Sequence, residues 1–399
     1  MKISYFTHSL LSCWNHGNAH FLRGVLSEMI RRGHAVSTYE PQGAWSLDNL
    51  LQDAGEAGLD AFRHHYPELH SHSFAADFDP AEACAGDDLV IVHEWNEPAL
   101  VAALGRARKA GGRFTLLFHD THHRAVSDPE AIRAFDLDGY DGVLAFGETL
   151  AAVYRRWGWG DRVFVWHEAA DPHVFHPPTV PGPREGLVWI GNWGDGERSG
   201  ELEHFLFGPA RRLGLPLDVF GVRYPEDALG TLRRYAAGYR GWLPNAAAPG
   251  VFARHMATVH VPRRFYVELL PGIPTIRVFE ALACGIPLVS APWDDSEGLF
   301  TVGQDFLMAR SGAEMERHLA ALRDDADLRD AVTAHGFATV MARHTCAHRV
   351  DELMGMLDRL GHSALAEPAP AKPAPAKPAL AKPALAEPAP ALPAAPVAR

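Results

Sequence analysis

Lysine and cysteine are scarce in this chain of 399 residues, and no apolar run approaches the roughly 18 residues of a membrane helix. Outside the alanine- and proline-rich end of the chain, the lysines are Lys2 and Lys109. This argues against a pyridoxal-phosphate enzyme, because that cofactor forms a Schiff base with a lysine. The four cysteines are far apart and form no metal-binding or disulfide pattern, as is typical of proteins in the reducing cytoplasm. We therefore expect a cytoplasmic protein with no transmembrane segment.

Positive charge is also in deficit. The chain has 37 lysine and arginine residues against 49 aspartate and glutamate residues, which gives a net charge of −12. Such a surface argues against nucleic acid or an anionic membrane as the main partner, so we expect no nucleic-acid partner. The 47% hydrophobic and 22% charged content is ordinary for globular domains. At about 150 residues per domain, the length predicts two or three domains.

Strand-like apolar runs alternate with helical repeats along most of the chain. The pattern begins with a short strand at residues 3–6 and restarts at residue 187, after a proline- and glycine-rich stretch. Repeated β-α-β units predict mostly parallel sheets. We predict an α/β fold with two domains, at residues 1–168 and 169–362. Residues 363–399 repeat alanine, proline and lysine, and we expect them to be a disordered tail.

The most informative stretch is residues 271–290. Thr275 suits the start of a helix, and Gly285 suits the position just after its end. On that helix Arg277 and Glu280 are three residues apart and share one face. One interpretation is an ion pair on a solvated face. The other is a nucleotide site, in which the helix N-terminus and Arg277 bind phosphate while the two oxygens of Glu280 bind a ribose diol.

The sequence Arg-Val-Phe-Glu-Ala-Leu-Ala-Cys-Gly, followed by Pro-Leu-Val-Ser, resembles the nucleotide-binding signature of glycosyltransferases with two facing Rossmann-like domains, the GT-B fold. More narrowly, it is similar to the spore-maturation CgeB-like branch. The resemblance implies an α/β fold in which the two predicted domains are both Rossmann-like and face each other across a cleft. It further implies that Glu280 holds the ribose of a sugar-nucleotide donor, and that the turn at Thr275 and Ile276 holds the diphosphate. It also implies that the last helix can return to the first domain. Many retaining members carry a second glutamate where this chain has Gly272, so inversion and retention both stay open.

Loops at the carboxyl ends of predicted strands supply further candidates, because parallel sheets bind their ligands there. The loop at residues 191–198 is glycine-rich but lacks the spacing of an NAD site. A tight turn is the alternative to donor binding for this loop, and helix capping is the alternative for Asn18. The further donor-binding candidates are Gly191, Asn192, Arg198 and Arg263. The candidates for acceptor or phosphate contact are Asn15, His16, Gly17 and Asn18.

Polar residues also follow two neighbouring strands of the first predicted domain. The densest cluster is at residues 119–123, where His119 or Asp120 could take a proton from an acceptor hydroxyl. His93 and Glu94, at the end of the neighbouring strand, compete for that catalytic role. The same histidines also allow a transition-metal site, although no spaced histidine partner accompanies them. A third interpretation is that the imidazoles are bonded to the loop backbone.

Together these features predict a metal-independent, hexosyltransferase-like glycosyltransferase. Its nucleotide-diphosphate sugar would be a substrate, and we expect no cofactor. The acceptor, which could be a glycan, lipid, protein or small molecule, is not identified by the sequence. Two alternatives stay open: a non-catalytic protein that binds a sugar nucleotide or glycan, and a metal-dependent hydrolase using residues 119–123.

Overall fold

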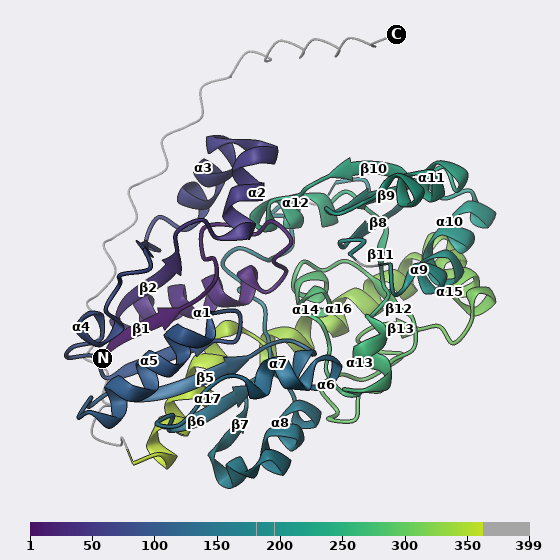
Figure 1. Cartoon of the computed structure of the whole chain (residues 1–399). Coiled ribbons are helices and arrows are strands. Elements are labelled where there is room, and N and C mark those ends of the chain that lie inside the picture. Colours follow the sequence, from purple (N-terminus) through teal and green to yellow (C-terminus); the bar gives the residue numbers. More distant parts are fainter. Residues whose placement is uncertain (181, 195, 362–399) are drawn as a thin grey trace, which may run out of the picture.

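The computed structural model describes residues 1–180, 182–194 and 196–361 as two α/β domains that lie side by side (Figure 1). The predicted tail at residues 363–399 lies outside the described residues.

The first domain contains a parallel sheet with the strand order β3-β2-β1-β4-β5-β6-β7. Its strands are β1 (Lys2–Phe6), β2 (Ala35–Pro41), β3 (Ser71–Phe74), β4 (Leu89–His93), β5 (Thr115–Asp120), β6 (Gly142–Ala145) and β7 (Val163–Val165). Its helices are α1 (Ala19–Arg31), α2 (Trp45–Ala54), α3 (Glu56–His65), α4 (Pro80–Ala83), α5 (Pro98–Lys109), α6 (Arg124–Ser127), α7 (Pro129–Arg133) and α8 (Glu148–Tyr154), followed by short helical turns at Arg155–Trp159 and Gly160–Arg162.

The second domain has a parallel sheet with the equivalent order β10-β9-β8-β11-β12-β13. Its strands are β8 (Leu187–Ile190), β9 (Leu217–Phe220), β10 (Gly238–Gly241), β11 (Ala257–His260), β12 (Leu288–Ser290) and β13 (Leu307–Met308). The helices after β8 are α9 (Ser199–Leu202), α10 (Gly208–Leu213), α11 (Glu226–Arg234), α12 (Ala248–Phe252), α13 (Arg264–Glu268), α14 (Ile276–Ala283), α15 (Gly312–Asp324), α16 (Ala326–Arg343) and α17 (Cys346–Arg359), with short turns at Glu203–Phe207 and Asn245–Ala247.

In both sheets the strand order changes direction beside the first strand. The first sheet grows from β1 through β2 to β3 and then resumes on the other side of β1 with β4, and the second does the same around β8 and β11. In such sheets the connections that leave β1 and β4, or β8 and β11, part to opposite faces and open a crevice at the carboxyl ends of the strands. The predicted α/β class with two Rossmann-like domains is therefore confirmed, and each domain has one such crevice.

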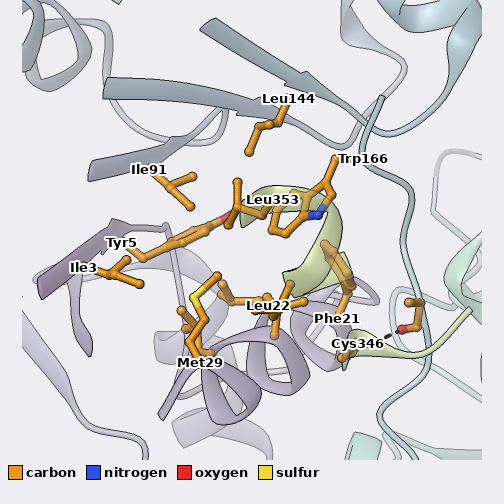
Figure 2. Close-up of a cluster of buried hydrophobic side chains, with 14 of the residues drawn as sticks. Ile3, Tyr5, Phe21, Leu22, Met29, Ile91, Leu144, Trp166, Cys346 and Leu353 are labelled. Carbon is orange, nitrogen blue, oxygen red and sulfur yellow. Dashed lines mark hydrogen bonds between the residues drawn. The ribbon is translucent and has the colours of Figure 1, made fainter. Parts of the chain in front are cut away.

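The last helix, α17, returns to the first domain, as the resemblance implied (Figure 1). In Figure 2, Leu353 of α17 lies among Ile3 and Tyr5 of β1 and Leu22 of α1, and all four side chains are buried. The Trp166 indole N–H donates to the backbone carbonyl of α17 residue Arg349 at 2.7 Å. The chain therefore crosses between the domains twice, which restricts their relative positions.

The sequence patterns missed the elements with little apolar content. The edge strand β3 has the sequence Ser-His-Ser-Phe and no fully buried residue, so it lacks the apolar pattern of a central strand. Strand β10 is similarly exposed, with the sequence Gly-Tyr-Arg-Gly. Both lie at a sheet edge, where a strand needs backbone pairing on one side only.

Candidate functional site

A cleft of about 950 Å³ lies between the domains and adjoins a smaller cavity of about 190 Å³, which is lined mainly by the second domain and also by the loop after β1. The size of the cleft is at the upper end of the range for small-molecule sites. Both spaces are lined by the loops that follow β1, β8 and β11, where the two crevices face each other. The residues shared by the two spaces are Asn15, His16, Gly17, Asn192, Arg198, Arg263, Tyr266, Thr275 and Ile276.

The N-terminus of α14 points into this shared region. Thr275 has extended backbone angles and precedes the helix, but its side chain makes no capping bond to the helix N–H groups. Its hydroxyl instead contacts His260 Nε2 at 3.1 Å. Thr275 and Ile276 line both spaces, and Arg277 lines the smaller one. The first turn thus offers backbone N–H groups, the positive end of the helix dipole and a guanidinium to an anion.

Arg277 and Glu280 form the ion pair that was one interpretation of their spacing. The face is not solvated, however, because the side chain of Glu280 is completely buried and that of Arg277 is only 17% exposed. The other carboxylate oxygen of Glu280 lies 2.9 Å from Nδ1 of His20, which belongs to α1 in the first domain. Glu280 is therefore part of a buried polar contact between the two domains.

The hydrogen bonds of His20 determine which ring nitrogen carries its proton. The backbone N–H of Asp171 donates to Nε2 at 2.9 Å, so Nε2 must be the acceptor. In the neutral ring Nδ1 then carries the hydrogen and donates it to Glu280. The ring also stacks on Phe175, with centroids 3.7 Å apart. His20 is thus held by the segment that crosses between the domains, and it holds α14 in turn.

Glu280 does not line the cleft or the smaller cavity. The side chain of Glu280 is completely buried and does not reach either space, so its contact with a ribose remains a prediction. The second glutamate of many retaining enzymes has no place here. Gly272 has φ of +95°, and a side chain at that position would run into the Ser296 hydroxyl.

The loop after β8 lies at the cavity, as expected for donor-binding residues. Arg198 donates to the backbone carbonyl of Asn192 at 3.2 Å, and its guanidinium lies over the Trp189 ring at 5.3 Å. Asn192 in turn donates from Nδ2 to Oδ1 of Asn15 at 2.8 Å, across the cleft. Gly191 lines the smaller cavity beside them. This loop joins the two domains over the cavity, and its role in donor binding remains a prediction.

The remaining predicted contacts also reach the cleft. Arg263 follows β11 and pairs with Glu197 at 2.9 Å, beside the cavity wall. Asn18 precedes α1 but makes no capping bond to it. Its amide donates instead to the Thr121 hydroxyl at 2.6 Å. His16 is buried at the border of both spaces, where burial holds the pKa of its imidazole well below the usual value.

Three of the four catalytic candidates lie below the cleft floor and do not line it. His119 contacts the Tyr5 hydroxyl at 2.5 Å, and burial lowers its pKa to about 3. Asp120 accepts from the Tyr154 hydroxyl at 2.7 Å. Burial raises the pKa of both Asp120 and Glu94, and the two carboxyls are close enough to influence each other. Their catalytic role remains a prediction.

Their neighbours His93, Thr121 and His122 line the cleft instead. His119 and Asp120 are the last residues of β5, whereas Thr121 and His122 follow the strand and reach the cleft.

Two of the three histidines in the cluster contact hydroxyl groups of the protein. The His123 ring contacts the Ser127 hydroxyl at 2.8 Å, while His119 is bonded to Tyr5. Within residues 1–180, 182–194 and 196–361, no group of three or more histidine, cysteine, aspartate or glutamate side chains is placed to hold a metal ion.

Trp242 and Asn245, which no sequence pattern indicated, lie on the wall of the smaller cavity. The indole nitrogen of Trp242 and the amide oxygen of Asn245 are buried without a hydrogen-bond partner in the protein. Both follow the unrecognised strand β10, so no strand end pointed to them.

Glu168, on the segment that leaves the first domain, was also missed as a site residue and lines the cleft. Burial, and next the negative charge of Glu280, raise its pKa to about 8. The Ile276 backbone N–H and Arg277 act in the opposite direction. Glu168 therefore lies beside the N-terminus of α14, where an anionic ligand would compete with its charged form.

Comparisons with known proteins agree with this architecture. Residues 198–355 match the family model described as glycosyl transferase-like. No curated protein matches the chain. Among solved structures, Anabaena HepE in complex with UDP and glucose is 12% identical, with a TM-score of 0.66 over 90% of this chain and 99% of that one.

Two further structures have the same fold. T4 phage BGT in complex with UDP-glucose is 14% identical, with a TM-score of 0.55 over 91% of this chain and 99% of that one. An α-glucosyltransferase in complex with UDP is 12% identical, with a TM-score of 0.62 over 90% and 100%. At these identities the likeness concerns the fold, and it confirms the GT-B-like pair of Rossmann-like domains. No helix in the described ranges is both long and apolar enough to span a bilayer.

The buried contact at Glu280 predicts a large effect on stability. Glu280→Ala leaves Arg277 without its ion pair and His20 without its acceptor, so we expect the free energy of unfolding to fall by about 3–5 kcal/mol. Urea unfolding measures this free energy. The matched control is Glu226→Ala, which removes an exposed pair with Arg233 and should have little effect. Equal, small effects in both variants would contradict the proposed contact.

The raised pKa of Glu168 predicts how stability depends on pH. In the unfolded chain a glutamate titrates near pH 4.3, so from there to about pH 8 the native state holds a proton that the unfolded state has lost. The free energy of unfolding should therefore fall as the pH rises through this window. Glu168→Gln removes the group, and we expect a shallower fall in urea unfolding between about pH 5 and pH 8. A slope identical to that of the wild type would show that Glu168 titrates normally.

Proposed function

We propose that the chain is a glycosyltransferase that moves a sugar from a UDP-sugar donor to an acceptor hydroxyl. The main evidence is the position of α14, whose N-terminus and Arg277 point at a cavity between two Rossmann-like domains. The family-model match covers this helix, and HepE, T4 phage BGT and the α-glucosyltransferase were solved with UDP or UDP-glucose. Hexosyl transfer without a metal and membership of the CgeB-like branch are part of the proposal and rest on the sequence resemblance.

The nucleotide base fits the smaller cavity in its chemistry. The amide oxygen of Asn245 needs a donor, and the indole N–H of Trp242 needs an acceptor. Uracil carries both kinds of group, an N–H and carbonyl oxygens, on one small ring. A cavity of about 190 Å³ suits such a ring better than a whole nucleotide sugar. We therefore place the base there and the sugar in the adjoining cleft.

The diphosphate then lies at the start of α14. The N-terminus of α14 and the guanidinium of Arg277 would stabilise the negative charge that grows on the departing diphosphate. Glu168 is protonated below about pH 8 and adds no repelling charge there when neutral. The chain's own groups thus supply the positive side of the site.

In this proposal His93 takes the proton of the acceptor hydroxyl. Its Nε2 contacts the Thr121 hydroxyl at 3.0 Å, and that hydroxyl also accepts from the Asn18 amide at 2.6 Å. Nδ1 of His93 has no hydrogen-bond partner in the protein, and we infer that it is the nitrogen that accepts the proton. Burial lowers the pKa of His93, which keeps the ring neutral and ready to accept. The Glu94 carboxyl group, whose pKa is raised by burial, lies 3.9 Å from Nδ1.

Binding of UDP-glucose tests the donor site. Arg277→Ala removes a charge-assisted contact to phosphate, so we expect binding at least about tenfold weaker by calorimetry. Arg233→Ala, which changes an exposed arginine outside both cavities, should bind as the wild type does. Circular dichroism checks that each variant is folded at the temperature of the titration. A wild-type protein that does not bind UDP-glucose would refute the proposal.

Release of UDP from UDP-glucose distinguishes an enzyme from a protein that only binds the donor. We expect His93→Ala to slow release, with water or added saccharide as acceptor, by about 10²–10⁴-fold while leaving UDP-glucose affinity unchanged. His64→Ala, at an exposed position, is the control. Wild-type protein that binds UDP-glucose and never releases UDP would favour the non-catalytic alternative.

A further inference from the structure

One arm of the cleft is built by the first domain alone and is not used by the proposed donor. It lies at the carboxyl ends of β2, β3 and β4. Its side chains are mostly aromatic or uncharged, and Glu97 is its one ionic group among the described residues. They are Pro41, Gln42, Ala44, Trp45, Phe74, Trp95, Asn96, Glu97 and Leu100.

Two tryptophans in this arm are unusually exposed. Trp45 is 54% exposed and Trp95 is 42% exposed, although both belong to a wall of the cleft. Trp95 is held in place by Arg124, whose guanidinium lies 4.4 Å from the ring centroid and also donates to the Glu94 carbonyl at 3.1 Å. A large apolar ring that is fixed and left open to solvent is typical of a binding surface.

Asn96, next to Trp95, has an amide oxygen that needs a partner. The residue is only 6% exposed, and its Nδ2 donates to the backbone carbonyls of Phe6 and His93, each at 2.9 Å. A backbone carbonyl can accept a hydrogen bond from the side-chain NH2 of Asn96 but not from its oxygen, so these two bonds determine the orientation of the amide. Oδ1 is therefore the atom left without a protein partner. The amide oxygen of Asn18, in the same cleft, is also unpartnered. Both atoms require a hydrogen-bond donor.

We propose that this arm binds the acceptor as a saccharide, with a sugar ring stacked on Trp95 and a hydroxyl donating to Oδ1 of Asn96. A pyranose combines an apolar C–H face, which suits the negative face of an indole, with hydroxyl donors at its edge. This inference rests on the proposed transferase function, because it assigns the acceptor side of the same cleft.

The charges of the arm argue against a nucleic-acid acceptor. One α-glucosyltransferase of similar fold was solved with a 13-mer DNA, so a nucleic acid is the alternative acceptor. DNA binding depends on lysine and arginine contacts to phosphate. Among the described residues, the first-domain side chains that line the cleft include no lysine or arginine. Phosphate oxygens are also acceptors only, and they cannot satisfy Oδ1 of Asn96 or Asn18.

The test is a glycan array of neutral oligosaccharides, probed with the full chain in the presence of UDP, followed by calorimetry with the strongest glycan. We expect Trp95→Ala to lower the affinity for that glycan at least tenfold. Trp95→Phe should lower the affinity less, because a smaller ring remains. Tyr239→Ala is the matched control, since it truncates an aromatic that is 39% exposed and lies outside both cavities. Its affinity should stay within twofold of the wild type.

The inference is overturned if no glycan binds, if Trp95→Ala binds the glycan as well as the wild type, or if a 13-mer DNA duplex binds more tightly than any glycan. A separate titration with UDP-glucose keeps the two proposals apart. Protein that binds UDP-glucose but no glycan refutes the acceptor subsite alone. Protein that binds the glycan through Trp95 but not UDP-glucose refutes the donor assignment and leaves the saccharide subsite standing.

Discussion

The buried bond between His20 and Glu280 is the contact on which the geometry of the cleft depends. It joins α1 of the first domain to α14 of the second, and the Asp171 backbone and the Phe175 ring hold His20 from the connecting segment. A charged group without water around it tolerates little displacement, because any loss of its partners leaves an unpaired charge in a low dielectric. The N-terminus of α14 therefore keeps one position relative to the first-domain loops.

That position divides the chemistry of the cleft between the domains. The second domain contributes helix N–H groups and Arg277, which suit an anion, and the first contributes His93, Asn96 and exposed tryptophans, which suit a neutral hydroxyl compound. Glu168 lies between the two sides, and burial raises its pKa. A transferase needs this separation, since its donor carries the charge and its acceptor supplies the hydroxyl.

The same contact explains the ambiguity of the Arg277–Glu280 pair in the sequence. Spacing placed the two charges on one face but did not say what covers that face. The covering group is His20, some 260 residues away in the chain, so the pair is buried and bridges the domains. Local pattern likewise located the ends of β4 and β5, yet His93, Thr121 and His122 line the cleft while Glu94, His119 and Asp120 lie below it.

The sequence alone determined the α/β class, the two successive Rossmann-like units, the helix at residues 276–283 and the loops at the strand ends, because apolar periodicity and turn residues are local signals. It could not identify β3 or β10, whose edge positions require few apolar residues, nor Trp242 and Asn245 beyond them. Tertiary structure alone decided which side chains reach the cleft and which partner Glu280 takes. Those outcomes depend on strand direction and on contacts between residues far apart in the chain, which no local pattern records.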